Sequence, residues 1–478
     1  MSASREKQMR KDMPAAPGQA PQKKNVWKWI VGCLVVLVAA ALIVASLLLN
    51  TNFFAKRNVA VTVGEHHITA AEYNYFYRAT YAKIAGDYGQ DSLSYLADYI
   101  TEQASKQVRD TYAIYDAAVA AGETLSEEDQ KKMDEDIELL RETATNLGYA
   151  DLDAFLAASY GVGCNEENYR EYLKVQTLAS NYTQKEQDSF NAELTQEKYN
   201  EYYQRNMLNF DTVSFRWFLV PVAQDRDMAK TEELARTMET MIKDDIPGFT
   251  KMAHDLAEEE EAEYYADESA TLVKDEKINY VDNDLRDWMA DASRQEGDTI
   301  VVRSADEIGT YVACFLSRDD HDYPSVNVRH ILVTAASDAD EETKKAAKEK
   351  AQGYLDEYLK GDKTEDAFAE IAKAHSEDNA SNGGLYENVV KGQMVSAFND
   401  WCYDPARQPG DTGIVETEYG YHVMYFVGPG ENARYKMVTD EMKSNHYTAW
   451  VMKLTEGYEI VTNDNGMNYT TRLQSNAQ

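Results

Sequence analysis

The chain carries one pattern of residues twice, and this repeat constrains the fold more than any other feature of the sequence. The second copy runs through VRHILV (328–333), FAEIAKAHSED (368–378), GGLYENVVKGQMVSAFNDW (383–401) and GDTGIVETEYGYHVMYFV (410–427). The first copy runs through FRWFLV (215–220), FTKMAHDLA (249–257), LRDWM (285–289), GDTIVV (297–302) and GTYVACFLS (309–317). Because a repeated sequence marks a repeated structural unit, two adjacent domains of one fold are predicted.

The two copies share a skeleton but differ in their histidines. A common offset of 113 residues relates Arg216 to Arg329, Asp287 to Asp400, Trp288 to Trp401 and Gly297 to Gly410. His330, however, matches Trp217, and His422 matches Tyr311. The pattern therefore predicts one catalytic domain and one structural relative that lacks its polar groups.

Each copy begins and ends with a β-rich segment and has helical segments between them. This order predicts α+β domains whose first and last strands lie close together. We expect a multidomain α+β protein. Its predicted parts are a basic tail (1–25), a membrane anchor (26–50), a helical chaperone-like domain (51–206), a degenerate first repeat (207–322), a complete second repeat (323–429), a returning helix and strand (430–465) and a loose tail (466–478).

The segment before the repeats reads as helical after a short strand at Val59 to Val63. Thr69, with Glu72 three residues later, predicts a helix start with a capping box. Tyr458 to Val461 is a β-like segment that we expect to return and pair with residues 59–63. Tyrosines are dense in this region, and they fit either a helix-packing core or a partly apolar cradle for unfolded chain.

Composition excludes some functions. The chain has 83 acidic and 48 basic residues, a formal net charge of -35, and this balance argues against nucleic-acid binding. The four cysteines show no CxxC spacing, which indicates neither a zinc site nor a disulfide framework. We expect no metal and no cofactor.

An apolar run near the N-terminus predicts a membrane anchor. Trp29 to Leu49 contains 21 residues without a charge, enough helix to span about 30 Å of hydrocarbon. Six basic residues lie among the 25 residues before Val26, so the N-terminus is expected in the cytoplasm and the bulk of the chain outside the cell membrane. A cleaved signal peptide is the competing interpretation, although the run is long for one.

The second copy resembles the parvulin family of peptidyl-prolyl cis-trans isomerases over residues 327–428. The resemblance rests on RHIL, FAEIAKAHSED, GG, GQMVSAF and a closing YGYHV in this order. The complete layout resembles extracytoplasmic foldases of the PrsA and SurA type. That resemblance implies a chaperone-like role for the helical domain.

The resemblance also implies site residues. It assigns His330 and His422 to a histidine pair, Asp378 to a polar position beside the proline amide, and Thr417 to the surrounding hydrogen-bond network. The implied substrate-binding residues are Met394, Phe398, Tyr386 and Gln393. Structural alternatives stay open: a histidine in a strand is often a core residue, Met394 and Phe398 have helix-core spacing, and Asp378 lies in a turn-forming loop.

The chain departs from the family at one rim of the expected pocket. The family commonly reads GGDLG, whereas this chain has Gly383-Gly384-Leu385-Tyr386-Glu387 after a short loop. We expect this departure to affect rate and substrate choice more than fold.

These features favour a membrane-anchored foldase that isomerises Xaa-Pro bonds in exported, incompletely folded proteins. The reaction makes and breaks no covalent bond, so an enzyme need only bind the twisted amide better than the planar forms. The first alternative is a non-catalytic holdase with a vestigial site. A third is an envelope structural protein that uses the repeats for assembly.

Overall fold

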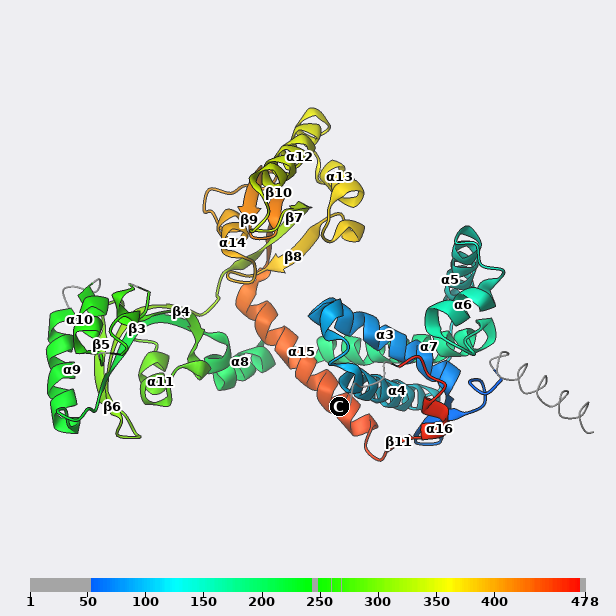
Figure 1. Cartoon of the computed structure of the whole chain (residues 1–478), viewed down its shortest axis with the longest axis horizontal. Helices are drawn as coiled ribbons and strands as arrows, with labels where there is room; N and C mark the ends of the chain where they lie inside the picture. Colours follow the sequence, from blue (N-terminus) through cyan, green and yellow to red (C-terminus); the bar gives the residue numbers. More distant parts are fainter. Residues whose placement is uncertain (1–52, 243–247, 259, 268, 473–478) are drawn as a thin grey trace, which may run out of the picture. The chain divides into compact units, whose positions relative to one another are not determined.

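The computed structural model describes residues 53–242, 248–258, 260–267 and 269–472 (Figure 1). The expected basic tail (1–25) and anchor (26–50) lie outside these residues. Among the helices that are described, none combines the length and the apolar character needed to cross a membrane. The chain divides into two compact units, one of residues 53–188 and 448–472 and the other of residues 189–447.

The first unit is mainly helical. Its elements are β1 (Val59–Val63), β2 (His66–Thr69), α3 (Ala70–Tyr88), η1 (Gln90–Ser92), α4 (Ala97–Ala120), α5 (Glu127–Asn146), α6 (Leu152–Tyr160), most of α7 (Glu166–Glu193), β11 (Ile460–Thr462) and α16 (Asp464–Met467). The expected return of the C-terminal segment is confirmed, because β11 pairs antiparallel with β1 in a sheet of order β11-β1-β2. The predicted capping box at Thr69 and Glu72 is also present and fixes the start of α3.

Tyrosines form much of the core of this unit. Tyr73, Tyr75 and Tyr77 on α3 are at most 1% exposed. The Tyr73 hydroxyl donates to the Thr101 carbonyl oxygen, and burial raises the pKa of Tyr73 to about 12. The packing interpretation therefore holds for these three residues, whereas Tyr95 on the segment before α4 is 92% exposed.

The end of the described chain is packed, which corrects the expectation of a loose tail from residue 466. Met467 is buried in the core beneath β1. Thr471 donates from its backbone N–H to the side-chain oxygen of Asn74, a fully buried residue on α3. The tail was expected to be loose because its composition is polar. A buried asparagine such as Asn74 needs a polar partner, however, and Thr471 provides one.

The second unit contains both repeats. The first repeat comprises β3 (Thr212–Pro221), α9 (Met228–Ile242), α10 (Gly248–Leu256), η2 (Tyr264–Ala266), β4 (Leu272–Lys277), η3 (Ile278–Tyr280), α11 (Asn283–Ala290), β5 (Thr299–Arg303) and β6 (Gly309–Asp319). The second comprises β7 (Pro324–Thr334), α12 (Glu341–Lys360), α13 (Glu365–His375), η4 (Ala380–Asn382), β8 (Leu385–Val389), α14 (Ser396–Cys402), β9 (Thr412–Thr417) and β10 (Gly420–Asn432). The mixed α+β prediction is confirmed.

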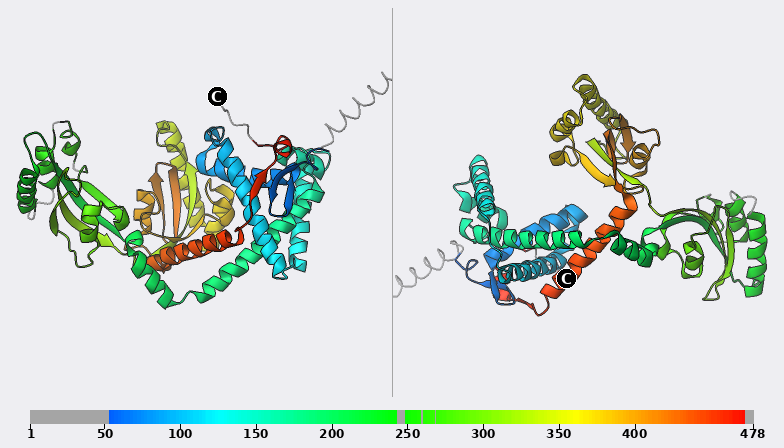
Figure 2. Two further views of the ribbon diagram at one scale, coloured as in Figure 1. Left: turned by 90° about the horizontal axis from the view of Figure 1, so that it is seen from below. Right: turned by 180° about the vertical axis from the view of Figure 1, so that it is seen from behind.

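The two repeats have the same sheet topology. Their antiparallel sheets have the orders β4-β3-β6-β5 and β8-β7-β10-β9, so the first and last strands of each repeat are neighbours. In the second repeat, α12 and α13 cover one face of the sheet and α14 covers the other (Figure 1; Figure 2 gives two further views). In the first repeat, α9 and α10 cover one face and α11 the other.

Equivalent contacts recur in the two repeats. The backbone N–H of Trp217 donates to the backbone carbonyl of Thr271 at 2.9 Å. The backbone N–H of His330 donates to the backbone carbonyl of Gly384 in the same way, also at 2.9 Å. Numbering differs by 113 for these pairs but by 111 for Tyr311 and His422. The first repeat therefore has two extra residues in the turn between β5 and β6.

Helix α8 (Gln196–Phe210) packs within the second unit, although the sequence placed it at the end of the helical domain. The reason is a buried ion pair: Arg318 contacts Asp211, which is fully buried, and the Tyr203 hydroxyl donates to Asp211 at 2.7 Å. Helix α15 (Ala433–Leu454) also begins in this unit, where Val438 packs near α8. From Thr448 onward it belongs to the helical unit, as expected for the returning helix.

Candidate functional site

The central strand pair of the second repeat brings two histidines together. In the antiparallel pairing of β7 and β10, His330 lies opposite Met424 and His422 lies opposite Leu332. Because side chains alternate along a strand, His422 and Met424 share the face that carries His330. The two histidines are 2% and 5% exposed, so both rings are buried on the face that α14 covers.

The imidazoles form one continuous polar contact. His330 Nδ1 lies 2.9 Å from His422 Nδ1, and the rings stack at 5.1 Å with 19° between their planes. On the far side, His422 Nε2 lies 2.9 Å from Thr417 Oγ1 at the end of β9. Since a hydrogen bond needs one donor and one acceptor, the two Nδ1 atoms must differ in protonation.

Asp378 closes the other end of this network. Its Oδ2 lies 3.2 Å from His330 Nε2, a close contact that does not have the geometry of a hydrogen bond. The Tyr386 hydroxyl donates to the same oxygen at 3.0 Å. The adjacent His330 imidazole, together with this hydroxyl, lowers the pKa of the Asp378 carboxyl. Burial and the carboxylate raise the pKa of Tyr386 to about 12, so the phenol stays protonated at neutral pH.

The carboxylate sets one direction for the hydrogen bonds. An ionised Asp378 only accepts, so a neutral His330 ring would carry its proton on Nε2, and its Nδ1 would then accept from His422 Nδ1. His422 Nε2 then accepts from the Thr417 hydroxyl. The reverse order would place the lone pair of His330 Nε2 against the carboxylate. Burial and the neighbouring His330 lower the pKa of His422 to about 4, which agrees with a neutral ring. We call the set Tyr386, Asp378, His330, His422 and Thr417 the polar relay.

The loop that carries Asp378 is fastened to β7. Ser376 Oγ accepts from the backbone N–H groups of Leu332 and Asp378, each at 3.2 Å, and donates to the Asp378 carbonyl. Glu377 accepts from the Thr334 N–H at 2.9 Å. These supporting residues were absent from the sequence prediction, although a serine two residues before an aspartate is typical of a side-chain-stabilised turn.

The two glycines before β8 let the Asp378 loop approach β7. Gly384 has a φ of 67°, and a Cβ there would lie 2.0 Å from the His330 carbonyl oxygen. A side chain is therefore incompatible with the pairing that holds His330. Asn379 also takes a left-handed conformation, and its side chain donates to the Leu385 carbonyl at 2.7 Å.

An apolar wall lies against the histidines. The Phe398 ring is 3% exposed and meets both imidazoles nearly at right angles, with centroids 5.5 Å apart. Met394 is half-buried in the same cluster. Gln393 is placed differently, because its side-chain oxygen accepts from the Val390 N–H in its own turn. Its predicted contact with substrate, like the roles of the other site residues, stays a prediction.

The first repeat fills the equivalent positions with aromatic and apolar groups. Trp217 and Tyr311 lie 5.8 Å apart, and the Tyr311 hydroxyl donates to Asp282 at 3.2 Å. Val273 occupies the strand position of Tyr386. This face therefore lacks the chain of titratable groups that the second repeat assembles.

The second site combines an apolar wall with a polar network whose two histidines are buried. Such a combination can hold a small apolar ring and meet an amide whose charge distribution changes as it twists. Within the described residues, no group of three or more histidine, cysteine or acidic side chains is placed to hold a metal ion.

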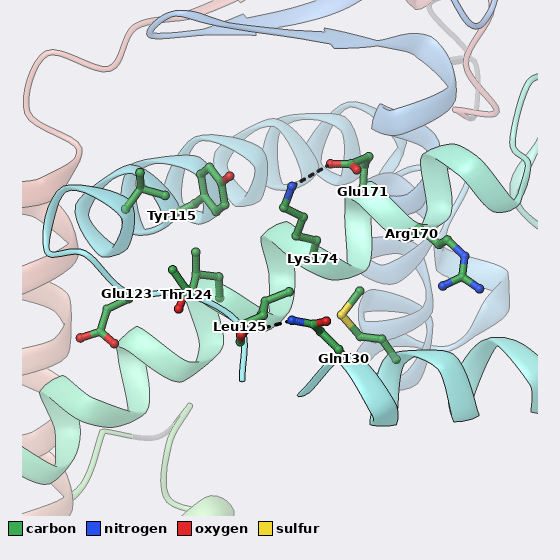
Figure 3. Close-up of a pocket in the computed structure, with 11 residues that line it drawn as sticks. Tyr115, Glu123, Thr124, Leu125, Gln130, Arg170, Glu171 and Lys174 are labelled. Carbon is green, nitrogen blue, oxygen red and sulfur yellow. Dashed lines mark hydrogen bonds and ion pairs between the residues drawn. The ribbon is translucent and has the colours of Figure 1, made fainter. Parts of the chain in front are cut away.

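A separate cavity of about 530 Å³ lies in the helical unit, between α4, the start of α5 and α7 (Figure 3). Its apolar lining comes from Tyr115, Val119, Leu125, Met133 and Leu178. The charged groups on its edge are paired: Lys174 contacts Glu171, and Lys185 contacts Glu123. The cavity therefore offers an apolar surface without an unpaired charge from these groups.

Comparison with known proteins identifies the second repeat. Residues 315–428 match the family described as PPIC-type PPIASE domain. Over 114 residues the chain is 34% identical to foldase protein PrsA 1 of Listeria innocua, a match that covers 23% of this chain and 33% of that protein. It is 35% identical over 104 residues to a putative peptidyl-prolyl cis-trans isomerase, NifM, of Azotobacter vinelandii, covering 21% of this chain and 34% of that protein.

The match thus spans about a third of the length of these curated relatives. Among solved structures, PrsA from Bacillus subtilis aligns with 76% of this chain and 85% of its own, at 16% identity and a TM-score of 0.24. The second repeat is a parvulin-type peptidyl-prolyl isomerase domain, as its sequence resemblance predicted.

Proposed function

We propose that this protein is a peptidyl-prolyl cis-trans isomerase and foldase that acts on Xaa-Pro bonds of exported, incompletely folded proteins. The observation that carries the proposal is the polar relay beside Phe398 and Met394, within the residues that match the isomerase family. The first repeat, which lacks the relay, is proposed to be non-catalytic.

The site suits a reaction whose barrier is loss of amide conjugation, about 18–20 kcal/mol. Met394 and Phe398 would hold the proline ring and leave the peptide carbonyl to rotate. The relay is already ordered by hydrogen bonds within the protein, so it meets the twisted amide without rearranging. Binding that is stronger for the twisted form than for either planar form lowers the barrier.

The test is cis–trans exchange of a proline peptide measured with the full chain. His330→Ala should reduce acceleration by on the order of 100-fold, since it removes a central preorganised polar group. His375→Ala is the matched control, because His375 lies in the same domain but stacks on Tyr354 outside the relay. No acceleration by the wild-type chain would instead support a holdase with a vestigial site.

We further propose that the cavity of the helical unit receives apolar side chains of the client. Its apolar lining and the adaptable Met133 fit side chains of varied shape. Val119 lines the cavity and is 51% exposed, so Val119→Asp should fold and suppress client aggregation less well than wild type. Leu139→Asp, at a 62% exposed position outside the cavity lining, should behave as wild type.

The proposed place of action is the outer face of the cell membrane. Its support is the apolar run from Trp29 to Leu49 and the six basic residues among the first 25. A tether would raise the local concentration of foldase near emerging chains. Protease added to intact cells should digest residues 53–478 and spare the basic tail. Complete protection of the chain from protease would contradict this topology. The alternative of an envelope structural role predicts neither cis–trans exchange of a proline peptide nor suppression of client aggregation.

A further inference from the structure

The family resemblance assigned Tyr386 to substrate binding, yet in the structure its contacts are with the polar relay. Its hydroxyl donates to Asp378 Oδ2 at 3.0 Å. Its ring lies 5.2 Å from the His330 ring, at 65°. Both the polar and the aromatic part of the side chain thus contact the groups that orient the histidine pair.

We propose that Tyr386 is a positioning residue that holds the Asp378 carboxylate against His330 and so fixes the direction of the hydrogen bonds through His422 to Thr417. The proposal rests on the proposed isomerase function and deepens it. It assigns Tyr386 a role that acts through Asp378, whereas the family resemblance implied a substrate-binding role.

The geometry around the carboxylate supports this role. The Asp378 side chain is 42% exposed, so water competes for it. Its contact with His330 Nε2 is close but poorly aligned, and such a contact alone leaves the carboxylate free to rotate. The Tyr386 hydroxyl is a second donor on the same oxygen, and together the two donors define one orientation.

Hydrogen bonds from Ser376 already fix the backbone at Asp378. Tyr386 therefore acts on the side-chain torsion of Asp378, which sets the direction of its carboxylate. Ser376 binds the N–H and carbonyl groups of Asp378. The charged or titratable groups facing the carboxyl are His330 from β7, Tyr386 from β8 and His422 from β10. Glu377, its neighbour, is engaged by Thr334 and by Lys350 from α12.

The first repeat gives an internal comparison. Where the histidine pair is replaced by Trp217 and Tyr311, the position of Tyr386 is held by Val273. The phenol therefore occurs in the repeat that has a histidine pair to orient, and an apolar side chain occurs in the other.

The experiment compares Tyr386→Phe and Tyr386→Leu with Tyr403→Phe in the full chain. Tyr403 is the matched control because its hydroxyl donates to the Val389 carbonyl on the same strand, outside the relay. Both Tyr386 variants should lower kcat about 10-fold with KM nearly unchanged, as expected for loss of a hydrogen bond to a charged group. The acid limb of the pH profile should also move to higher pH, because the pKa of Asp378 rises when a donor is lost.

A second readout does not depend on turnover. Nitrogen chemical shifts of the His330 and His422 rings, measured with labelled histidine, should report one tautomer pair in wild type and Tyr403→Phe, and a mixture in both Tyr386 variants. Unchanged shifts and an unchanged pH profile in Tyr386→Phe would overturn the positioning role. A wild-type chain without turnover but with the shift change would refute the isomerase function and retain the positioning role.

Discussion

The two repeats share one fold but differ in the side chains buried between the sheet and the short helix, which is α11 in the first repeat and α14 in the second. Both sheets have the same order, and both place an arginine over a tryptophan, Arg294 over Trp288 at 4.7 Å and Arg407 over Trp401 at 4.0 Å. The second repeat then buries a histidine pair where the first buries Trp217 and Tyr311. The fold is therefore compatible with either interior, and catalysis must be argued from the site.

The difference also shows what a buried polar network requires. A buried polar group without a partner destabilises the fold, so the buried His330 and His422 need polar partners. On the equivalent face of the first repeat, the Tyr311 hydroxyl donates to Asp282.

The largest expected effect is on stability and turnover, and it compares two buried residues at equivalent positions, Phe398 on α14 and Leu285 on α11. Phe398→Ala should lower the free energy of unfolding by about 3–5 kcal/mol, since it leaves a cavity in a buried core, and should abolish turnover. Leu285→Ala, at a position 1% exposed in the first repeat, should cost about 2–5 kcal/mol and leave turnover intact. Denaturant unfolding and peptide exchange measure the two quantities. Equal loss of turnover in both variants would contradict the assignment of catalysis to one repeat.

The second prediction concerns how the free energy of unfolding falls at low pH. Folding lowers the pKa of His422 to about 4, whereas an unfolded histidine titrates near about 6.5, so the unfolded state binds more protons between these values. This stability is complete above about pH 6.5 and is lost as pH falls toward about 4, by about 3 kcal/mol in all. The lowered pKa of Asp378 acts in the same direction at lower pH.

His422→Phe should remove that pH dependence from the unfolding free energy. Tyr311→Phe should leave it in place, because the pKa of Tyr311 is raised to about 12 by burial and its phenol does not titrate in acid. An unchanged slope of unfolding free energy against pH in His422→Phe would show that His422 is not buried as a neutral ring.

A third, smaller effect concerns binding of the substrate's proline ring. Met394→Ala should raise KM about 10-fold, a loss of about 1.4 kcal/mol of contact with the proline ring, because Met394 is half-buried beside Phe398. Exchange rates measured over a range of peptide concentrations separate KM from kcat. A fall in kcat alone would place Met394 outside the substrate contact.

The smallest effect tests what the repeats share. Arg294→Ala and Arg407→Ala should each lower the unfolding free energy by about 1 kcal/mol, through loss of the stacked guanidinium. Neither should change kcat. Thermal unfolding of both variants checks the similarity, and a loss confined to one repeat would show that the shared arrangement is not energetically equivalent.

Much of the fold follows from the sequence because strand alternation and the repeat are local signals. They predicted the neighbouring first and last strands and the return of β11 to β1. The histidine pair was implied by the family resemblance, and the pairing of β7 with β10 places both histidines on one face. The hydrogen bond from Tyr386 to Asp378 was not predictable, since it depends on the left-handed turn at Asn379. The membership of α8 depends on the distant contact between Asp211 and Arg318, which no local pattern encodes.

The central claim is that the buried imidazole network of the second repeat, and no group of the first, accelerates prolyl isomerisation. The most direct test is the cis–trans exchange rate of a proline peptide with two variants at equivalent positions, His422→Phe and Tyr311→Phe. We expect His422→Phe to lose acceleration by on the order of 100-fold and Tyr311→Phe to keep the wild-type rate. A wild-type rate in His422→Phe, or an equal loss in both variants, would contradict the claim.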